Sequence, residues 1–292
     1  METPIGQQQD ARPVVVGVDG SRTARAAVRS AAREAHARGT ALDVVLAFPW
    51  REGDDVPAPP GLDGRAVLHL AAGLVVEEMA AAARRDCPGL PVTHRIVAGR
   101  PVDVLTEESR QAQLVCVGTH GTGTLGDLVL GSTTAALVGR AHCPVLAVPE
   151  TTVRTRERTG VVVGLDGSAA DRDLAAFALA AAAARGCDLV AVRAWRRDLP
   201  HPGADEQAAQ RRAETGVEDT LTAVREHHPA VRVHAIVEPA TAARLLVGAS
   251  LTAELVVVGH RHHPLSRLGS VTHALLHQAG CPVAVVPVSG HG

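Results

Sequence analysis

The chain contains an internal duplication, which limits its possible folds more than any other feature of the sequence. Residues 161–168 (VVVGLDGS) repeat residues 14–21 (VVVGVDGS), and a Gly-Ser pair at 131–132 recurs at 269–270. The offset between the copies falls from 147 residues at the first motif to 138 at the second, so the second copy has shorter loops. A chain of 292 residues is long enough for two ordinary domains. The duplication therefore predicts two units of one fold.

Within each copy, short β-branched runs alternate with helical patterns. In the first copy we expect strands at 13–18, 42–48, 91–97, 114–117 and 144–148, with helices at 24–38 and 65–85 among those between them. We expect Ser21 or Thr23 to cap the first helix, and Pro101 to begin the third. The alternation predicts an α/β fold whose mostly parallel sheet has helices on both faces.

Composition along the chain suggests where the two units begin and end. Residues 1–12 are polar and are expected to form a disordered leader. Residues 13–149 are expected to form the first domain and residues 160–288 the second. The charged segment 150–159 lacks apolar periodicity and is interpreted as a linker.

A glycine-rich loop follows the fourth strand of the first copy and precedes a helical pattern at Ser132. A strand, a glycine loop and a helix start together favour anion binding, because the first N–H groups of a helix have no partner within it. We expect the loop glycines to permit positive φ and close approach to a ligand, and Ser132 to cap the helix or to donate to phosphate. The glycines of this loop are Gly118, Gly121, Gly123, Gly126 and Gly131.

Gly118 and Gly121 enclose two residues, nine more precede Gly131, and Ser132 follows. This spacing, G-2x-G-9x-G-S, resembles the nucleotide-binding signature of the universal stress protein family. Two successive copies that resemble this family together span nearly the whole chain, as in a tandem, two-domain member of actinobacterial type. It implies two tandem doubly wound parallel-sheet domains, Rossmann-like and adenine nucleotide alpha hydrolase-like, each with five strands in the order 3-2-1-4-5. It also implies ATP as the ligand, with Mg²⁺.

The resemblance implies that Asp19 contacts the nucleoside part of ATP, at the carboxyl ends of the strands where strand order reverses. An aspartate that bonds its own turn is the alternative, and Phe48 and Pro49 could equally be a partly buried strand end. The candidate binding residues of the first copy are Asp19, Gly20, Ser21, Phe48, Pro49, Gly99, Gly118, Thr119, Gly121, Gly131, Ser132 and Thr133. Those of the second copy are Asp166, Gly259, Gly269 and Ser270.

The second copy departs from the motif, which weakens the expectation of binding there. His262 stands at the second-copy position that corresponds to Gly121. Six residues, rather than nine, lie between it and Gly269, and one of them, Pro264, has no backbone N–H to donate. We therefore expect one tight ATP site per chain, in the first copy, and a weak or empty second one.

Two metal sites can be suggested from the sequence, each with a simpler alternative. Asp127 could approach a phosphate-bound Mg²⁺ or be a solvated loop acid. His260, His262 and His263 could bind a metal, but they fit no local site pattern and could equally be loop histidines. No metal-binding or catalytic residue is assigned.

Several classes of protein are excluded by what the sequence lacks. It has no lysine, which excludes a Walker A loop and a Schiff-base enzyme. A net charge of −2 with interspersed signs shows no basic face for nucleic acid, and a local basic patch is left open. We expect no membrane association and a cytoplasmic location, because no signal peptide and no apolar run of ~20 residues is present. Five scattered cysteines favour reduced thiols.

Three functions are compatible with these features. The first is an ATP-binding stress-response sensor or regulator with little or no hydrolysis, acting on an unknown protein partner. The second is a slow ATPase or phosphotransferase, and the third is a scaffold or chaperone-like protein with a vestigial site. Under the implied strand order the apolar strands at 144–148 and 282–288 lie at sheet edges. We expect these edges to pair between the two halves, in a homodimer, or in both ways.

Overall fold

The computed structural model describes residues 12–50, 54, 56–58, 60–121, 130–150, 160–195, 205–261 and 268–288. We call residues 12–150 the first half and residues 160–288 the second half. The expected leader lies outside the described residues except for Arg12, and the expected linker except for Glu150.

Each half alternates strand and helix from beginning to end, as predicted. The first half consists of β1 (Val14–Gly17), α1 (Arg22–Ala37), β2 (Leu42–Phe48), α2 (Gly64–Asp86), β3 (Val92–Ala98), α3 (Pro101–Glu108), β4 (Leu114–Gly118), α4 (Ser132–Val138) and β5 (Val145–Val148). The second half consists of β6 (Val161–Leu165), α5 (Asp171–Arg185), β7 (Leu189–Ala194), α6 (Glu206–Arg225), β8 (Val233–Glu238), α7 (Ala242–Ser250), β9 (Leu255–Arg261), α8 (Ser270–Gln278) and β10 (Val283–Val288).

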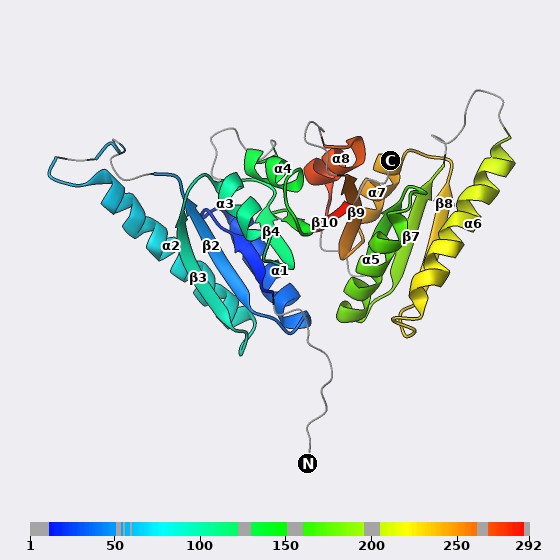
Figure 1. The fold of residues 1–292 in the computed structure, drawn as a ribbon, viewed down its shortest axis with the longest axis horizontal. Coiled ribbons are helices and arrows are strands. Elements are labelled where there is room, and N and C mark those ends of the chain that lie inside the picture. Colours follow the sequence, from blue (N-terminus) through cyan, green and yellow to red (C-terminus); the bar gives the residue numbers. More distant parts are fainter. Residues whose placement is uncertain are drawn as a thin grey trace, which may run out of the picture.

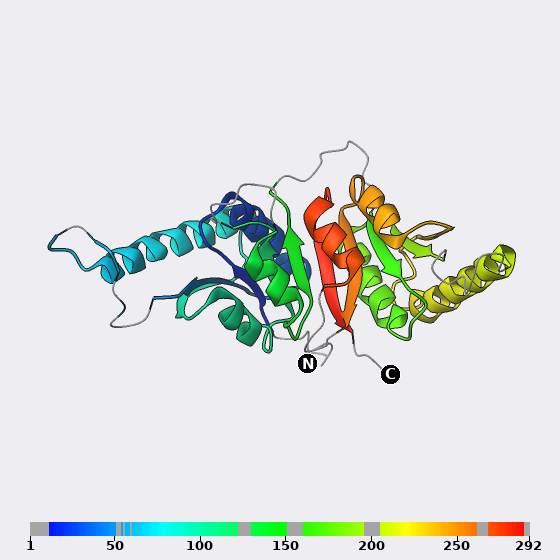
Figure 2. The same ribbon diagram turned by 90° about the horizontal axis from the view of Figure 1, so that it is seen from above.

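All of these strands belong to one ten-stranded sheet with the order β3-β2-β1-β4-β5-β10-β9-β6-β7-β8. Within each half the order is the expected 3-2-1-4-5, and neighbouring strands are parallel. The expectation of two separate five-stranded sheets is wrong, because β5 pairs antiparallel with β10. Figure 2 shows these two strands side by side at the centre of the molecule. We call this pair, in which Leu146 lies opposite Ala284, the seam.

The seam confirms that the edges pair between the two halves, while pairing in a homodimer stays a prediction. Helices α1, α2, α5 and α6 cover one face of the sheet, and α3, α4, α7 and α8 cover the other (Figure 1). Each apolar layer contains residues from both halves. Leu146 and Ala284 belong to the layer under α1, α2, α5 and α6, and Val145 and Val285 belong to the layer on the other face. The hydrophobic core therefore continues across the seam.

The helix starts follow the sequence signals with one exception. Ser21 caps α1 by accepting a hydrogen bond from the N–H of Ala24 at 3.1 Å, and Pro101 is the first residue of α3, as predicted. Ser132 does not cap α4, because Gly131 is the cap residue and Ser132 begins the helix. The N–H of Gly131 donates to the carbonyl of Thr119 at 2.8 Å, which holds the start of α4 at Gly131, one residue before Ser132.

Helix α2 extends beyond the sheet at one end of the molecule (Figure 1). It packs on α1, β2 and β3, but Val67, Leu70 and Leu74 near its N-terminus are exposed. Among the described residues it is the one helix long and apolar enough to cross a membrane by length and composition alone. Core helices of soluble proteins pass the same test.

We expect Leu146→Ala to lower the free energy of unfolding by about 2–5 kcal/mol, because it opens a cavity where the core crosses the seam. Leu146 is 2% exposed. The matched control is Leu70→Ala on α2, where the side chain is 69% exposed and the change should stay within about 0.5 kcal/mol. Urea denaturation measures both, and equal effects would contradict a core that continues through the seam.

Candidate functional site

The first half contains a cavity of about 850 Å³ at the carboxyl ends of β1, β2 and β4. The sequence-predicted residues that line it come from segments far apart in the chain. They are Asp19, Ser21, Phe48, Pro49, Gly118, Gly121, Gly131, Ser132 and Thr133. The structure therefore brings most of the first-copy candidates into one site, at the place expected for a doubly wound sheet.

The other three first-copy candidates shape the backbone around the cavity. Gly20 has a φ of 84° and Gly99 a φ of 139°, in the region that favours glycine. The N–H of Gly99 donates to the carbonyl of Phe48 at 2.9 Å, which holds the end of β2. Thr119 is buried, and its N–H donates to the carbonyl of Val148 at 3.0 Å. These residues position the wall of the cavity without lining it.

Asp19 lies between the two sides of the cavity and makes the turn contact that was considered as an alternative. Its Oδ1 accepts a hydrogen bond from the N–H of Ser21 at 2.9 Å. Its Oδ2 faces Gly121, because a Cβ added to that glycine would lie 2.8 Å from it. One carboxylate oxygen thus supports the turn while the other points toward the glycine loop.

The loop glycines are required for space rather than for positive φ. The expectation of positive φ is wrong for Gly118, Gly121 and Gly131, and Gly123 and Gly126 lie outside the described residues. A Cβ at Gly118 would lie 2.5 Å from Oγ1 of Thr23, and one at Gly131 would lie 3.2 Å from the carbonyl oxygen of Thr119. Each described glycine therefore allows two segments of backbone or side chain to meet where a larger residue would separate them.

Sequence reasoning missed one wall of the cavity and one side chain of the loop. Trp50, Leu68 and Val75 line the cavity from the end of β2 and from α2. His120 also lines it, with Nδ1 at 2.9 Å from Oγ1 of Thr119, and its carbonyl accepts a hydrogen bond from the hydroxyl of Thr23. The position of His120 inside the glycine motif could have identified it. The spacing of apolar residues in α2 could not identify the ones that line the cavity, because several faces of this helix are apolar.

The sheet order places an apolar wall and a polar wall on opposite sides of Asp19. On the side of β2 and α2 the lining includes Phe48, Trp50 and Leu68, and on the side of β4 and α4 it includes the hydroxyls of Ser132 and Thr133. Among the described lining residues, Asp19 and His120 carry the titratable side chains. The cavity can therefore accommodate a flat apolar group on one side and hydrogen-bond acceptors on the other.

At the corresponding place in the second half, a carboxylate of the protein accepts hydrogen bonds from the backbone at the end of β6. Asp171 stands where the first half has Ala24, one of the cavity-lining residues. Its carboxylate accepts hydrogen bonds from the N–H groups of Asp166 at 3.0 Å and of Gly167 at 2.8 Å. Burial raises the pKa of Asp171, and these two donors offset only part of that effect. A carboxylate of the chain thus occupies donors at the end of β6.

Arginines surround Asp166, the second-half equivalent of Asp19. Burial acts to raise its pKa, but hydrogen bonds from Ser168 and the charges of Arg261 and Arg193 outweigh it and lower the pKa. Nη2 of Arg261 lies 3.4 Å from Oδ2 of Asp166. Where Phe48 lines the first-half cavity, the larger Trp195 is 3% exposed and packs on α6. In the second half a salt bridge and a buried indole thus stand where the first half has Asp19 and a cavity-lining ring.

The remaining second-half candidates lie in β9 and at the start of α8. Gly259 is in β9, Gly269 is the cap residue of α8, and Ser270 is its first residue. His262 and Pro264, on which the expected weakness of this copy partly rested, lie outside the described residues. The reason for asymmetry that the described structure supplies is Asp171, which the sequence comparison did not identify.

Neither metal suggestion gains support from the described part of the chain, where no group of three or more His, Cys, Asp or Glu side chains is placed to hold a metal ion. Asp127 and His263 lie outside it, and His260 is buried in β9. All five cysteines are free thiols. Burial raises the pKa of Cys116, and that of Cys143 to about 12, which keeps these thiols protonated and unreactive.

Comparisons with known proteins agree on one family. The sequence model of the universal stress protein family matches residues 11–149 and 158–287. The chain is 35% identical to universal stress protein Rv2005c of Mycobacterium tuberculosis over 93% of its length and 96% of that protein. It is also 35% identical to Rv2623 of the same organism, over 93% and 95%. A universal stress protein structure from Archaeoglobus fulgidus covers 95% of the chain and 96% of its own with a TM-score of 0.70 and 17% identity, which shows the fold alone.

We expect Gly118→Ala to lower the free energy of unfolding by about 1–3 kcal/mol, because the new Cβ would overlap the side chain and backbone of Thr23. The matched control is Gly259→Ala at the equivalent position of β9. There the new Cβ would lie 3.0 Å from the flexible end of Leu174, which can move. Chemical denaturation compares the two. A control as costly as Gly118→Ala would show that the approach of α1 to β4 is not the constraint.

Proposed function

The chain belongs to the universal stress protein family, and on this basis we propose that its first half binds an adenine nucleotide, with ATP as the expected ligand. In this proposal the protein is a nucleotide-dependent sensor that passes a conformational signal to a protein partner. It hydrolyses ATP slowly or not at all.

The observation that carries this proposal is the cavity in which Asp19 separates an apolar wall from the glycine loop. Its volume of about 850 Å³ lies within the range of small-molecule sites. Phe48 and Trp50 would contact the base, and Asp19 would accept hydrogen bonds from ribose hydroxyls. Ser132, Thr133 and the loop N–H groups would hold the phosphates. The residues present therefore fit the nucleotide.

The charge of the cavity supports binding without rapid turnover. Residues 118–134 contain no arginine or lysine, and His120 is the one basic side chain among them. Phosphoryl transfer relies on cations and a positioned base around the transferred group. When bound with the nucleotide, Mg²⁺ would supply positive charge at the phosphates. The chain itself supplies hydroxyls, N–H groups and one imidazole, so little stabilisation of a transition state is expected.

The carboxylate of Asp171 in the second half supports a single site per chain. Asp171 uses two N–H groups at the end of β6, and an added nucleotide would meet its negative charge. The first half has Ala24 at that position, which leaves room for a ligand. We therefore propose that the nucleotide binds to the first half and that the second half has a structural or signalling role.

Isothermal titration calorimetry with ATP and Mg²⁺ should find one tight site per chain. We expect Asp19→Ala to weaken binding roughly 10- to 100-fold, because hydrogen bonds to a charged group are lost. Gly121→Asp should abolish binding by adding bulk and negative charge beside Asp19. Asp166→Ala is the matched control and should leave the affinity unchanged. Two equal sites, or a tight site that survives Gly121→Asp, would refute the assignment.

Native mass spectrometry and a hydrolysis assay distinguish the sensor from its two alternatives. Freshly purified protein should retain adenine nucleotide in the wild type and lose it in Asp19→Ala. Turnover should stay far below the ~10 s⁻¹ that is ordinary for enzymes. A rate near that value, abolished by Asp19→Ala, would favour an ATPase or phosphotransferase. Absence of any nucleotide binding would favour a scaffold with a vestigial site.

A further inference from the structure

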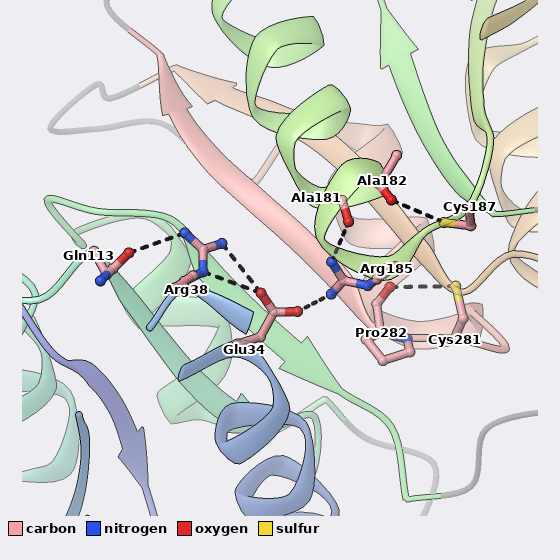
Figure 3. A network of polar contacts seen from close by, with 9 residues as sticks. All are labelled: Glu34, Arg38, Gln113, Ala181, Ala182, Arg185, Cys187, Cys281 and Pro282. Carbon is pink, nitrogen blue, oxygen red and sulfur yellow. Dashed lines mark hydrogen bonds and ion pairs between the residues drawn. The ribbon is translucent and has the colours of Figure 1, made fainter. Parts of the chain in front are cut away.

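The two halves meet at a buried cluster of charges beside the seam, which we call the seam cluster: Glu34, Arg38 and Arg185 (Figure 3). Nη2 of Arg185 in the second half donates to Oε1 of Glu34 in the first. Oε2 of the same carboxylate accepts from Nε and Nη2 of Arg38 at 3.4 and 3.3 Å. One carboxylate therefore holds two guanidinium groups, one from each half.

The two arginines occupy equivalent positions in the duplicated sequence. Val14 pairs with Leu42 in the first half as Val161 pairs with Leu189 in the second, which fixes the offset at 147 residues. Arg38 and Arg185 share this offset. Arg38 is the C-terminal cap residue of α1 and Arg185 is the last residue of α5, and each precedes a glycine with a φ of 63°. The two arginines thus face each other across the approximate symmetry of the seam.

The acid between them has no equivalent. At the position of Glu34 the second half has Ala181, whose carbonyl oxygen accepts a hydrogen bond from Nη1 of Arg185 at 2.9 Å. The second half instead contributes Phe177, whose ring lies 5.6 Å from the guanidinium carbon of Arg38. The seam cluster therefore combines two symmetric arginines with one carboxylate that only the first half supplies.

The surroundings make this carboxylate necessary. The side chains of Glu34, Arg185 and Arg38 are 9%, 20% and 25% exposed. Burial lowers the pKa of both arginines, because removal from water disfavours the charged form. Glu254 adds its negative charge near Arg185, yet the described structure contains no ion pair between them. Without Glu34, two buried guanidiniums would face each other with no bonded acid.

We propose that Glu34 makes the pairing surface of the second half specific for a first half, so that β10 accepts the β5 of a first half and rejects another β10. Two second halves meeting in the same way would bring two copies of Arg185 together with Ala181 where the carboxylate is needed. The partner selected is the first half of the same chain, because the covalent connection raises its effective concentration above that of any second copy.

The test moves the carboxylate across the seam in the full-length protein. Glu34→Ala should speed amide hydrogen exchange at the paired residues of β5 and β10 by roughly 100-fold, because it leaves two buried charges unpaired. The double variant Glu34→Ala/Ala181→Glu places the single acid on the second half, between the same two arginines. It should return exchange at the seam to within about threefold of the wild type, a residual loss of less than ~1 kcal/mol.

The matched control is Glu78→Ala, which removes an ion pair with Arg25 whose side chains are 52% and 50% exposed. It should leave exchange at the seam unchanged. Unchanged exchange in Glu34→Ala, or a double variant as impaired as the single one, would overturn the proposal. If Glu34→Ala is insoluble, recovery of soluble protein with the oligomeric state of the wild type in the double variant supports the proposal, and failure of both to fold refutes it.

Discussion

The antiparallel pairing of β5 with β10 is the interaction on which the rest of the arrangement depends. Each half alone would end in an apolar strand whose N–H and C=O groups have no partner on one side. The seam satisfies them, continues both apolar layers and brings α1 against α5. The outer strands of the joined sheet are then β3 and β8, where most side chains are exposed. Strands with that many exposed side chains are less prone to add further strands than the buried ones at the seam.

The two halves share one backbone fold but carry different side chains at the carboxyl ends of their strands. In the first half small side chains, such as Ala24 and the loop glycines, leave a cavity beneath the switch point of the sheet. In the second half Asp171 and Trp195 stand at the positions of Ala24 and Phe48, and Asp171 accepts hydrogen bonds from two backbone N–H groups. The strands keep the same order in both halves, while a few side chains at the strand ends differ between them.

The order of elements, the cap at Ser21 and the strand order within each half could be predicted, because they depend on local signals and on the family resemblance. Joining into one sheet was only one of several options for the edges, since the sequence does not reveal which edge meets which. The contribution of Leu68 to the cavity was missed because it depends on how α2 crosses the sheet. Asp171 was missed, since its bonds to preceding N–H groups cannot be read from the spacing of the sequence.

The unequal seam cluster has a consequence for how such a chain can change over generations. In a dimer of identical chains every interface residue is encoded once and appears twice, so a glutamate near the axis brings its own copy with it. Here the two sides are encoded separately, so position 34 is acidic while position 181 is alanine. Two copies within one chain can therefore carry different residues on the two sides of their contact, which a dimer of identical chains cannot do.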